Sequence, residues 1–164
     1  MNRTDFTPSH LGLATKEESK AASQHHLGVP AGSHILTSAG ELPIEYIGAG
    51  DKAITRDCGL SLIKAIEPVE FRGPIVRLLA GTLGQAHPDK DILLPADQLI
   101  LLRDWRAKML FGSDEILVPV RRLVDGEFVT LIENGEITLF QMELAAGQIV
   151  YADGLETAIS PPNP

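Results

Sequence analysis

The chain has 164 residues, 44% of them hydrophobic, which suffices for one domain with a substantial core. It carries 14 lysines and arginines against 22 aspartates and glutamates, a formal net charge of −8. Nucleic-acid-binding domains usually present a basic surface, and an anionic membrane would repel this charge. We therefore expect neither nucleic acid nor a membrane as a partner.

The cysteine content and the absence of long apolar runs indicate the compartment. Cys58 is the only cysteine, so no internal disulfide and no cysteine-based metal site are expected. No apolar run approaches the ~20 residues of a membrane-spanning helix, and no apolar segment follows Arg3 as it would in a signal peptide. The default expectation is a cytoplasmic protein, with export without a signal left open.

The two ends of the chain differ in composition from its centre. Residues 1–27 include a charged run without an apolar stripe, which predicts a flexible arm. Residues 160–164 are rich in proline, which excludes a helix there. The sequence thus predicts an arm at 1–27, one domain at 28–159 and a proline-rich tail at 160–164.

Within the domain, turn signals recur at short intervals and separate short apolar or alternating segments. Strands are expected at 34–37, 61–69, 75–79, 98–103, 115–120, 128–132, 136–144 and 148–152, and helical turns only at 43–46 and 120–124. Many short strands between turns indicate an all-β sandwich or barrel. The strongest hairpin signal is Asn134-Gly135, because a type I′ turn requires a positive φ at both central residues.

No group of side chains forms a pattern typical of catalysis or metal binding. The glycines at 48–50 lack the Lys-Ser/Thr that follows in a phosphate-binding loop. His25 and His26 lie on the expected arm, where neighbouring side chains of an extended chain point to opposite sides. No metal and no cofactor are therefore expected. Asp153 and Glu156 suggest a solvated turn.

One aromatic residue falls between two cations. Trp105 lies between Arg103 and Arg106, an arrangement that permits cation–π stacking on a ligand. We expect instead that the indole covers the edge of the core.

The order of several motifs resembles the Hint (Hedgehog/intein) domain, in the bacterial branch often found as stand-alone chains. The residues that carry the resemblance are GSHILTSAGELPIE (32–45), GDKAITRD (50–57), LAGTLG (79–84), LRDWRAKMLFG (102–112) and ADGL (152–155). The resemblance covers residues 28–159. It implies a compact all-β fold of two halves related by a pseudo-twofold axis.

The resemblance also implies self-processing chemistry. In the family, a cysteine at the first position of the domain attacks the preceding carbonyl and converts the amide to a thioester. A histidine in a T/S-x-x-H block protonates the departing amide nitrogen. A thiol, a hydroxyl, a sterol or water then resolves the thioester.

The reactive groups of the family are absent at the matching positions of this chain. The cysteine position falls on Gly28, and the S-P-x-H block places Leu94 at the hydroxyl residue and Asp97 at the histidine. The two later histidine positions fall on Gln141 and Gly147. These changes predict a Hint domain without catalytic residues.

Such a domain would serve as a non-catalytic scaffold or interaction module for an unidentified protein or peptide. A cleft near Gly28, lined by Leu94, Pro95 and Asp97, is expected to receive the partner. An autoprocessing enzyme that uses Ser33 through an N–O acyl shift, or Cys58 as a displaced nucleophile, is the alternative. A third reading is a subunit whose partner supplies the missing groups, and the oligomeric state stays open.

Overall fold

The computed structural model describes residues 27–84 and 87–160, whose regular secondary structure consists mostly of β-strands. The strands are β1 (Val29–Pro30), β2 (His34–Thr37), β3 (Gly40–Pro43), β4 (Lys52–Thr55), β5 (Gly59–Leu78), β6 (Ile92–Pro95), β7 (Leu99–Leu102), β8 (Ile116–Pro119), β9 (Val129–Leu144), β10 (Ile149–Ala152) and β11 (Leu155–Ala158). All their pairings are antiparallel, and together they form one sheet in the order β1-β9-β5-β4-β2-β10-β11-β7-β8, with β3 beside β2 and β6 beside β5. The expected all-β class is confirmed.

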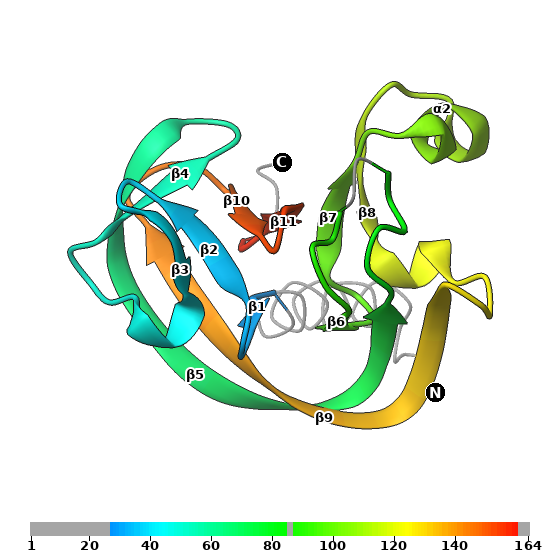
Figure 1. Ribbon diagram of the computed structural model, residues 1–164, viewed down its shortest axis with the longest axis horizontal. Coiled ribbons are helices and arrows are strands. Elements are labelled where there is room, and N and C mark those ends of the chain that lie inside the picture. The colour runs from blue at the N-terminus through cyan, green and yellow to red at the C-terminus, as the bar shows by residue number, and fades with distance from the viewer. Residues whose placement is uncertain (1–26, 85–86, 161–164) are drawn as a thin grey trace, which may run out of the picture.

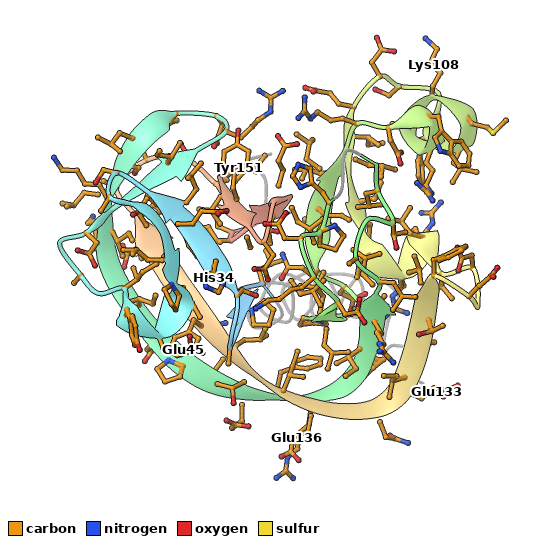
Figure 2. The ribbon with its side chains drawn as sticks, in the orientation of Figure 1. His34, Glu45, Lys108, Glu133, Glu136 and Tyr151 are labelled. Carbon is orange, nitrogen blue, oxygen red and sulfur yellow. The ribbon has the colours of Figure 1, made fainter. Side chains whose placement is uncertain are left out.

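Two long strands form the frame of the molecule. β5 and β9 pair along most of their length and curve together beneath two groups of shorter strands (Figure 1). On the outer side of this curve, Glu136 points away from the sheet (Figure 2). Burial alternates only in part along these strands: Ile63 and Leu139 are buried, whereas Leu62 and Leu131 are exposed.

The prediction of a hairpin at Asn134-Gly135 is wrong. Gly73-Pro74, a dipeptide that is common in turns, forms no turn either. Both dipeptides lie inside the long strands, where Gly73 is opposite Gly135, and neither Asn134 nor Gly135 has a positive φ. From Gly73 to Ile75 on β5, the pairing on β9 moves from Gly135 to Ile132, so β9 holds one extra residue there. Such a bulge bends a strand, which explains why a turn signal lies within a continuous strand.

The core has two main parts, one in each group of short strands. One part lies in the half that contains β2, β4 and β10, and includes Ile35, Ala53 and Val150. The other lies in the half that contains β6, β7 and β8, and includes Leu94 and Ile100. The β10–β11 hairpin joins the halves, since β10 pairs with β2 and β4 while β11 pairs with β7.

The helical segments among the described residues are short. The helical turns η1 (Ile44–Tyr46) and η2 (Val120–Leu123) lie where they were expected. The sequence did not predict α2 (Trp105–Phe111), which begins where the Asp104 carboxylate accepts from the Arg106 N–H at 3.0 Å. None of the helices in residues 27–84 and 87–160 has the length and apolar character needed to cross a membrane.

The expectation that Trp105 covers the core is wrong. Trp105 is 63% exposed, and the buried residue of α2 is Ala107. The Arg106 guanidinium lies 4.8 Å from the centre of the indole ring, so the cation–π contact is internal to the helix.

Gly135 provides a test of the bulge. A Cβ at this position would overlap Cδ1 and Cγ1 of Ile75 on the partner strand. We expect Gly135→Ala to lower the free energy of unfolding by about 1–3 kcal/mol through overpacking. Denaturant unfolding measures this value. Gly48→Ala is the matched control, because nothing lies within 4 Å of its Cβ position and its φ is not positive. Equal effects of the two substitutions would contradict the close packing of Gly135 against Ile75.

The turn that leads into β9 provides a pH-dependent test. Oδ1 of Asp125 accepts from the N–H groups of Glu127, Phe128 and Val129 at 2.8, 2.9 and 2.9 Å. These bonds, that of Val129 foremost, hold the pKa of the Asp125 carboxyl below its ordinary value of 3.8. The carboxylate therefore stabilises the fold above that value, and the contribution is lost as the pH falls through the lower folded-state pKa.

Asp125→Asn is expected to lower the free energy of unfolding by about 1 kcal/mol at neutral pH. The difference between wild type and variant should shrink as the pH falls below 3.8. Denaturant unfolding at a series of pH values measures it. Asp114→Asn, at a carboxylate that is 91% exposed, is the control, and a difference for Asp125→Asn that stays constant with pH would argue against the backbone cap.

Candidate functional site

Gly28 lies at the start of the domain with its backbone packed against β9. Gly28 is buried, and the next residue in the sequence, Val29, pairs with Phe140 of β9. A Cβ on residue 28 would lie 2.9 Å from the carbonyl oxygen of Phe140 and 3.5 Å from Cβ of Leu139. Since the nearest atom belongs to the backbone of a long strand, it cannot move aside cheaply. This position therefore favours glycine over every residue with a side chain, cysteine included.

The side chain beside the backbone of Gly28 is that of Gln98. The Gly28 N–H donates to Oε1 of Gln98 at 3.0 Å, and both groups are buried. Nε2 of Gln98 donates to the carbonyl oxygens of Ala158 at 2.7 Å and Leu99 at 3.1 Å. One neutral amide thus satisfies backbone groups of the residue before the first strand, of the last strand and of β7.

Gln98 was not among the residues singled out from the sequence. Its neighbour Asp97 was placed at the histidine of the S-P-x-H block, but Oδ1 of Asp97 lies 2.9 Å from Nε of Arg121, and both side chains are nearly half exposed. Reading the block one residue later, at 95–98, puts Gln98 at the histidine position. The contact with the Gly28 nitrogen is the signal that distinguishes the two registers, and it exists only in the folded chain.

The cleft expected near Gly28 is not formed by the residues assigned to it. Leu94 is completely buried in the core, and Pro95 is buried as well. Asp97 lies on the surface with Arg121. A completely buried side chain cannot line an open cleft, so these residues do not form one together.

Of the two later positions of the family pattern, one lies on β9 and the other in the β9–β10 turn. Gln141 follows Phe140 on β9 and pairs in register with Glu67 of β5. Gly147 lies in the turn with a φ of 88°, and a Cβ there would be 3.0 Å from Oγ1 of Thr55. Gln141 is therefore the residue after Phe140, whose carbonyl oxygen lies beside Gly28, and Gly147 packs against Thr55 of β4.

The two alternative nucleophiles lie in different surroundings. Cys58 is exposed in the turn between β4 and β5, where its N–H donates to Oγ1 of Thr55 at 3.0 Å. That turn is at the far end of the β4–β5 hairpin from β1 (Figure 1). Ser33 is only 2% exposed and lies just after β1. Nζ of Lys90 donates to the carbonyl oxygen of Gly32 at 2.6 Å, next to Ser33.

The expectation of a solvated turn is wrong for Asp153. This residue lies between β10 and β11 with a φ of 50° and is only 2% exposed. Its Oδ1 accepts from the N–H of His34 at 3.0 Å. His34 is the first residue of β2, whereas Asp153 lies between β10 and β11, and β11 pairs with β7. Asp153 therefore belongs to the junction between the two halves.

The described part of the chain holds no obvious metal centre. In residues 27–84 and 87–160, no three His, Cys, Asp or Glu residues lie close enough together to hold a metal ion. His10, His25 and His26 lie outside the described residues.

Gln98 provides a test of this arrangement. Replacing it by alanine leaves the Gly28 N–H and the Ala158 carbonyl without their partner and opens a cavity in the interior. We expect Gln98→Ala to cost about 2–4 kcal/mol of unfolding free energy, measured by denaturant unfolding. The adjacent exposed Asp97→Ala should cost at most about 1 kcal/mol. A loss of less than about 1 kcal/mol for Gln98→Ala, or a greater loss for Asp97→Ala than for Gln98→Ala, would contradict this role of Gln98.

Comparison with known proteins supplies the family. Residues 28–159 match the Hint domain family. An intein-like domain from the bacterium Clostridium thermocellum superposes with a TM-score of 0.53 at 16% identity, covering 82% of this chain and 99% of that domain. The MchDnaB-1 intein superposes with a TM-score of 0.51 at 12% identity, covering 79% of this chain and 98% of the intein.

At these identities the solved structures show a shared fold and nothing about shared activity. No curated protein matches the sequence. The family match, in contrast, spans most of the chain and begins at Gly28, the residue held by Gln98. This chain belongs to the Hint domain family.

Proposed function

We propose that this chain is a Hint domain that has lost self-cleavage and serves as a non-catalytic scaffold or interaction module for another protein or peptide. The observation that supports the proposal is how Gly28 is packed and hydrogen-bonded. Its amide is bonded to Gln98, and the carbonyl of Phe140 occupies the space next to its α-carbon.

The first supporting argument concerns the nucleophile. Acyl transfer within the chain needs a thiol or hydroxyl on the residue that follows the attacked carbonyl. Residue 28 has no side chain, and a Cβ there would lie 2.9 Å from the Phe140 oxygen. The backbone of β9 therefore disfavours a return to cysteine by a single substitution.

The second supporting argument concerns the acid. Cleavage before residue 28 requires a proton for the departing amide nitrogen. The group that faces this nitrogen is Oε1 of Gln98, which accepts the existing N–H at 3.0 Å. A carboxamide has no titrating proton, so it holds the amide in place without acting as an acid.

Burial argues against a partner that supplies the missing groups. Gly28 is buried, and Gln98 has no exposed surface. A side chain from another protein would have to displace part of the core to reach this amide. The interpretation that this chain forms half of an active site shared with a partner is therefore the least supported.

The autoprocessing alternative has one observation in its favour. The carbonyl of Gly32, which a Ser33 hydroxyl would attack, accepts from the Lys90 ammonium at 2.6 Å. A cation at a carbonyl oxygen stabilises the negative charge that develops there during acyl transfer. The same contact also serves a purely structural role, because it satisfies a backbone oxygen in the turn after β1.

Mass spectrometry of the intact full-length chain tests the proposal. We expect one species at the full 17.7 kDa, both freshly purified and after hours with a reducing thiol at neutral pH. Loss of a fragment that ends at residue 27 or 32 would overturn the proposal. Cleavage abolished by Ser33→Ala and slowed by Lys90→Met would then support the alternative, whereas cleavage abolished by Cys58→Ala would assign the displaced thiol.

A further inference from the structure

The first half of β9 forms an open edge of the sheet. β1 pairs with the far part of β9, and just beyond β1 the Ala31 N–H donates to the carbonyl of Thr138 at 2.9 Å. At the other end of β9, the Asp125 N–H donates to the carbonyl of Val129 at 2.9 Å. Between these two bonds, residues 130–137 have no strand partner except β5 in the part of the chain that the structure describes.

Backbone groups of this edge point away from β5 at regular positions. In an antiparallel strand, the N–H and C=O of one residue point to the same side, and those of the next residue point to the opposite side. Val129 points away from β5, so Leu131 does too, and Thr138 points away, so Glu136 does too. Val129 and Thr138 are an odd number of residues apart, which the bulge in β9 explains. Leu131 and Glu136 thus direct an N–H and a C=O outward from the edge.

Apolar side chains flank the edge on both faces of the sheet. Leu131 is 44% exposed and pairs with the buried Val76, whereas Ile132 is 39% exposed and pairs with the buried Ile75. Paired residues lie on the same face. Val76 belongs to the core of the half that contains β6, and Ile75 packs with Phe71 in a smaller cluster. A further strand beside β9 would therefore cover Leu131 and Ile132 and extend both clusters.

The opposite edge of the two long strands has a different composition. In the described part of the chain, residues 66–73 of β5 have no strand partner except β9. Pro68 lies within this edge, and Pro74 directly follows it. Proline has no N–H to donate and protects sheet edges against further pairing. Residues 130–137 contain no proline, so the edge of β9 keeps all its backbone donors.

The charge of the β9 edge indicates what kind of strand it favours. Glu133 lies in the bulge on the outer side of β9 (Figure 2), and it has no ion pair among the described residues. Oε2 of Glu136 accepts from Nε of Arg72 at 2.8 Å. Two copies paired through this edge would bring their glutamates together, and like charges that face each other destabilise a sheet. The formal net charge of −8 also favours a basic partner over a second copy.

We propose that an extended basic segment of a partner polypeptide adds as a strand to the edge of β9 at residues 130–137. Its apolar side chains cover Leu131 and Ile132, and a lysine or arginine lies beside Glu133. Strand addition gains affinity from main-chain hydrogen bonds and specificity from side-chain contacts. The added strand is antiparallel to β9, as β1 is, and a groove of about 440 Å³ beside Ile137 leaves room at the end nearest β1.

This inference rests on the proposed interaction role and names the chemistry of the partner. The edge is separate from the buried amide of Gly28, so binding and self-cleavage are measured independently. An uncleaved chain that fails to bind removes the strand addition alone, and a cleaved chain that binds removes the loss of activity alone.

Amide hydrogen exchange of the full ¹⁵N-labelled chain tests the proposal. The probe is a blocked peptide in which a central Lys-Val-Val is flanked by threonines and a second lysine. We expect a saturating amount of peptide to slow exchange of the Leu131 and Glu136 N–H groups by about tenfold or more. The N–H groups of Thr130 and Ile137, which point toward β5, should change little. Unchanged exchange at Leu131 and Glu136 would overturn the proposal.

A second arm leaves the protein unchanged and tests the main-chain bonds. Methyl groups are placed on the backbone nitrogens of alternate residues of the peptide, in one version on the odd and in the other on the even residues. Each version lacks donors on one edge only. We expect one version to bind about tenfold or more weakly than the other. Equal binding of the two versions would contradict strand addition.

Glu133→Gln tests the charge of the edge. We expect this variant to bind the peptide about two- to fivefold more weakly, as for the loss of one exposed charge pair. Glu41→Gln, at an exposed residue of β3, removes the same charge elsewhere and should bind as the wild type does. Equal binding by Glu133→Gln and Glu41→Gln would overturn the basic character of the partner. Slower exchange at Leu131 and Glu136 on raising the protein concentration without peptide would assign the edge to a second copy and overturn the proposal.

Discussion

One buried carboxamide joins the beginning and the end of this domain. Gln98 accepts from the N–H of Gly28, before the first strand, and donates to the carbonyl of Ala158, in the last strand. Residues 28 and 158 are separated by nearly the whole domain in sequence, so no local interaction can bring them together. The hydrogen bonds form in a water-excluded interior, where an unpaired amide or carbonyl is costly.

The same constraint determines what the start of the domain can do chemically. The backbone of residue 28 packs so closely against Phe140 that the position favours a residue without a side chain. The side chain that faces the amide nitrogen is an acceptor that does not ionise. Packing and hydrogen bonding together thus stabilise the peptide bond that the family's chemistry would cleave, which is why we interpret the domain as a scaffold.

Beside this closed interior, the β10–β11 turn links the two halves of the domain. Asp153 adopts a left-handed backbone conformation and caps the N–H of His34 on β2. Its second oxygen has no donor within the described chain. A fold can tolerate a few such groups when the rest of the hydrogen-bond network is satisfied.

Local sequence patterns were sufficient for part of this structure. Alternating apolar residues and turn signals predicted the all-β class, the strand at 34–37 and the helical turns at η1 and η2, because these depend on neighbours along the chain. The ordered motifs also led to the Hint family, which the match over residues 28–159 shows. The short α2 was missed because only Ala107 and Phe111 of its 7 residues pack in the core, which is too few for a recognisable apolar stripe.

Other features were decided only by tertiary contacts. Asn134-Gly135 has the local signal of a turn, yet pairing with the long β5 strand makes it part of a bulge. Asp153 has the sequence context of a solvated turn, yet the meeting of the two halves buries it. The sequence by itself determined the family and the missing thiol at Gly28. Tertiary structure decided that Gln98 holds the Gly28 amide, since hydrogen bonds between distant segments depend on register and packing that no local pattern specifies.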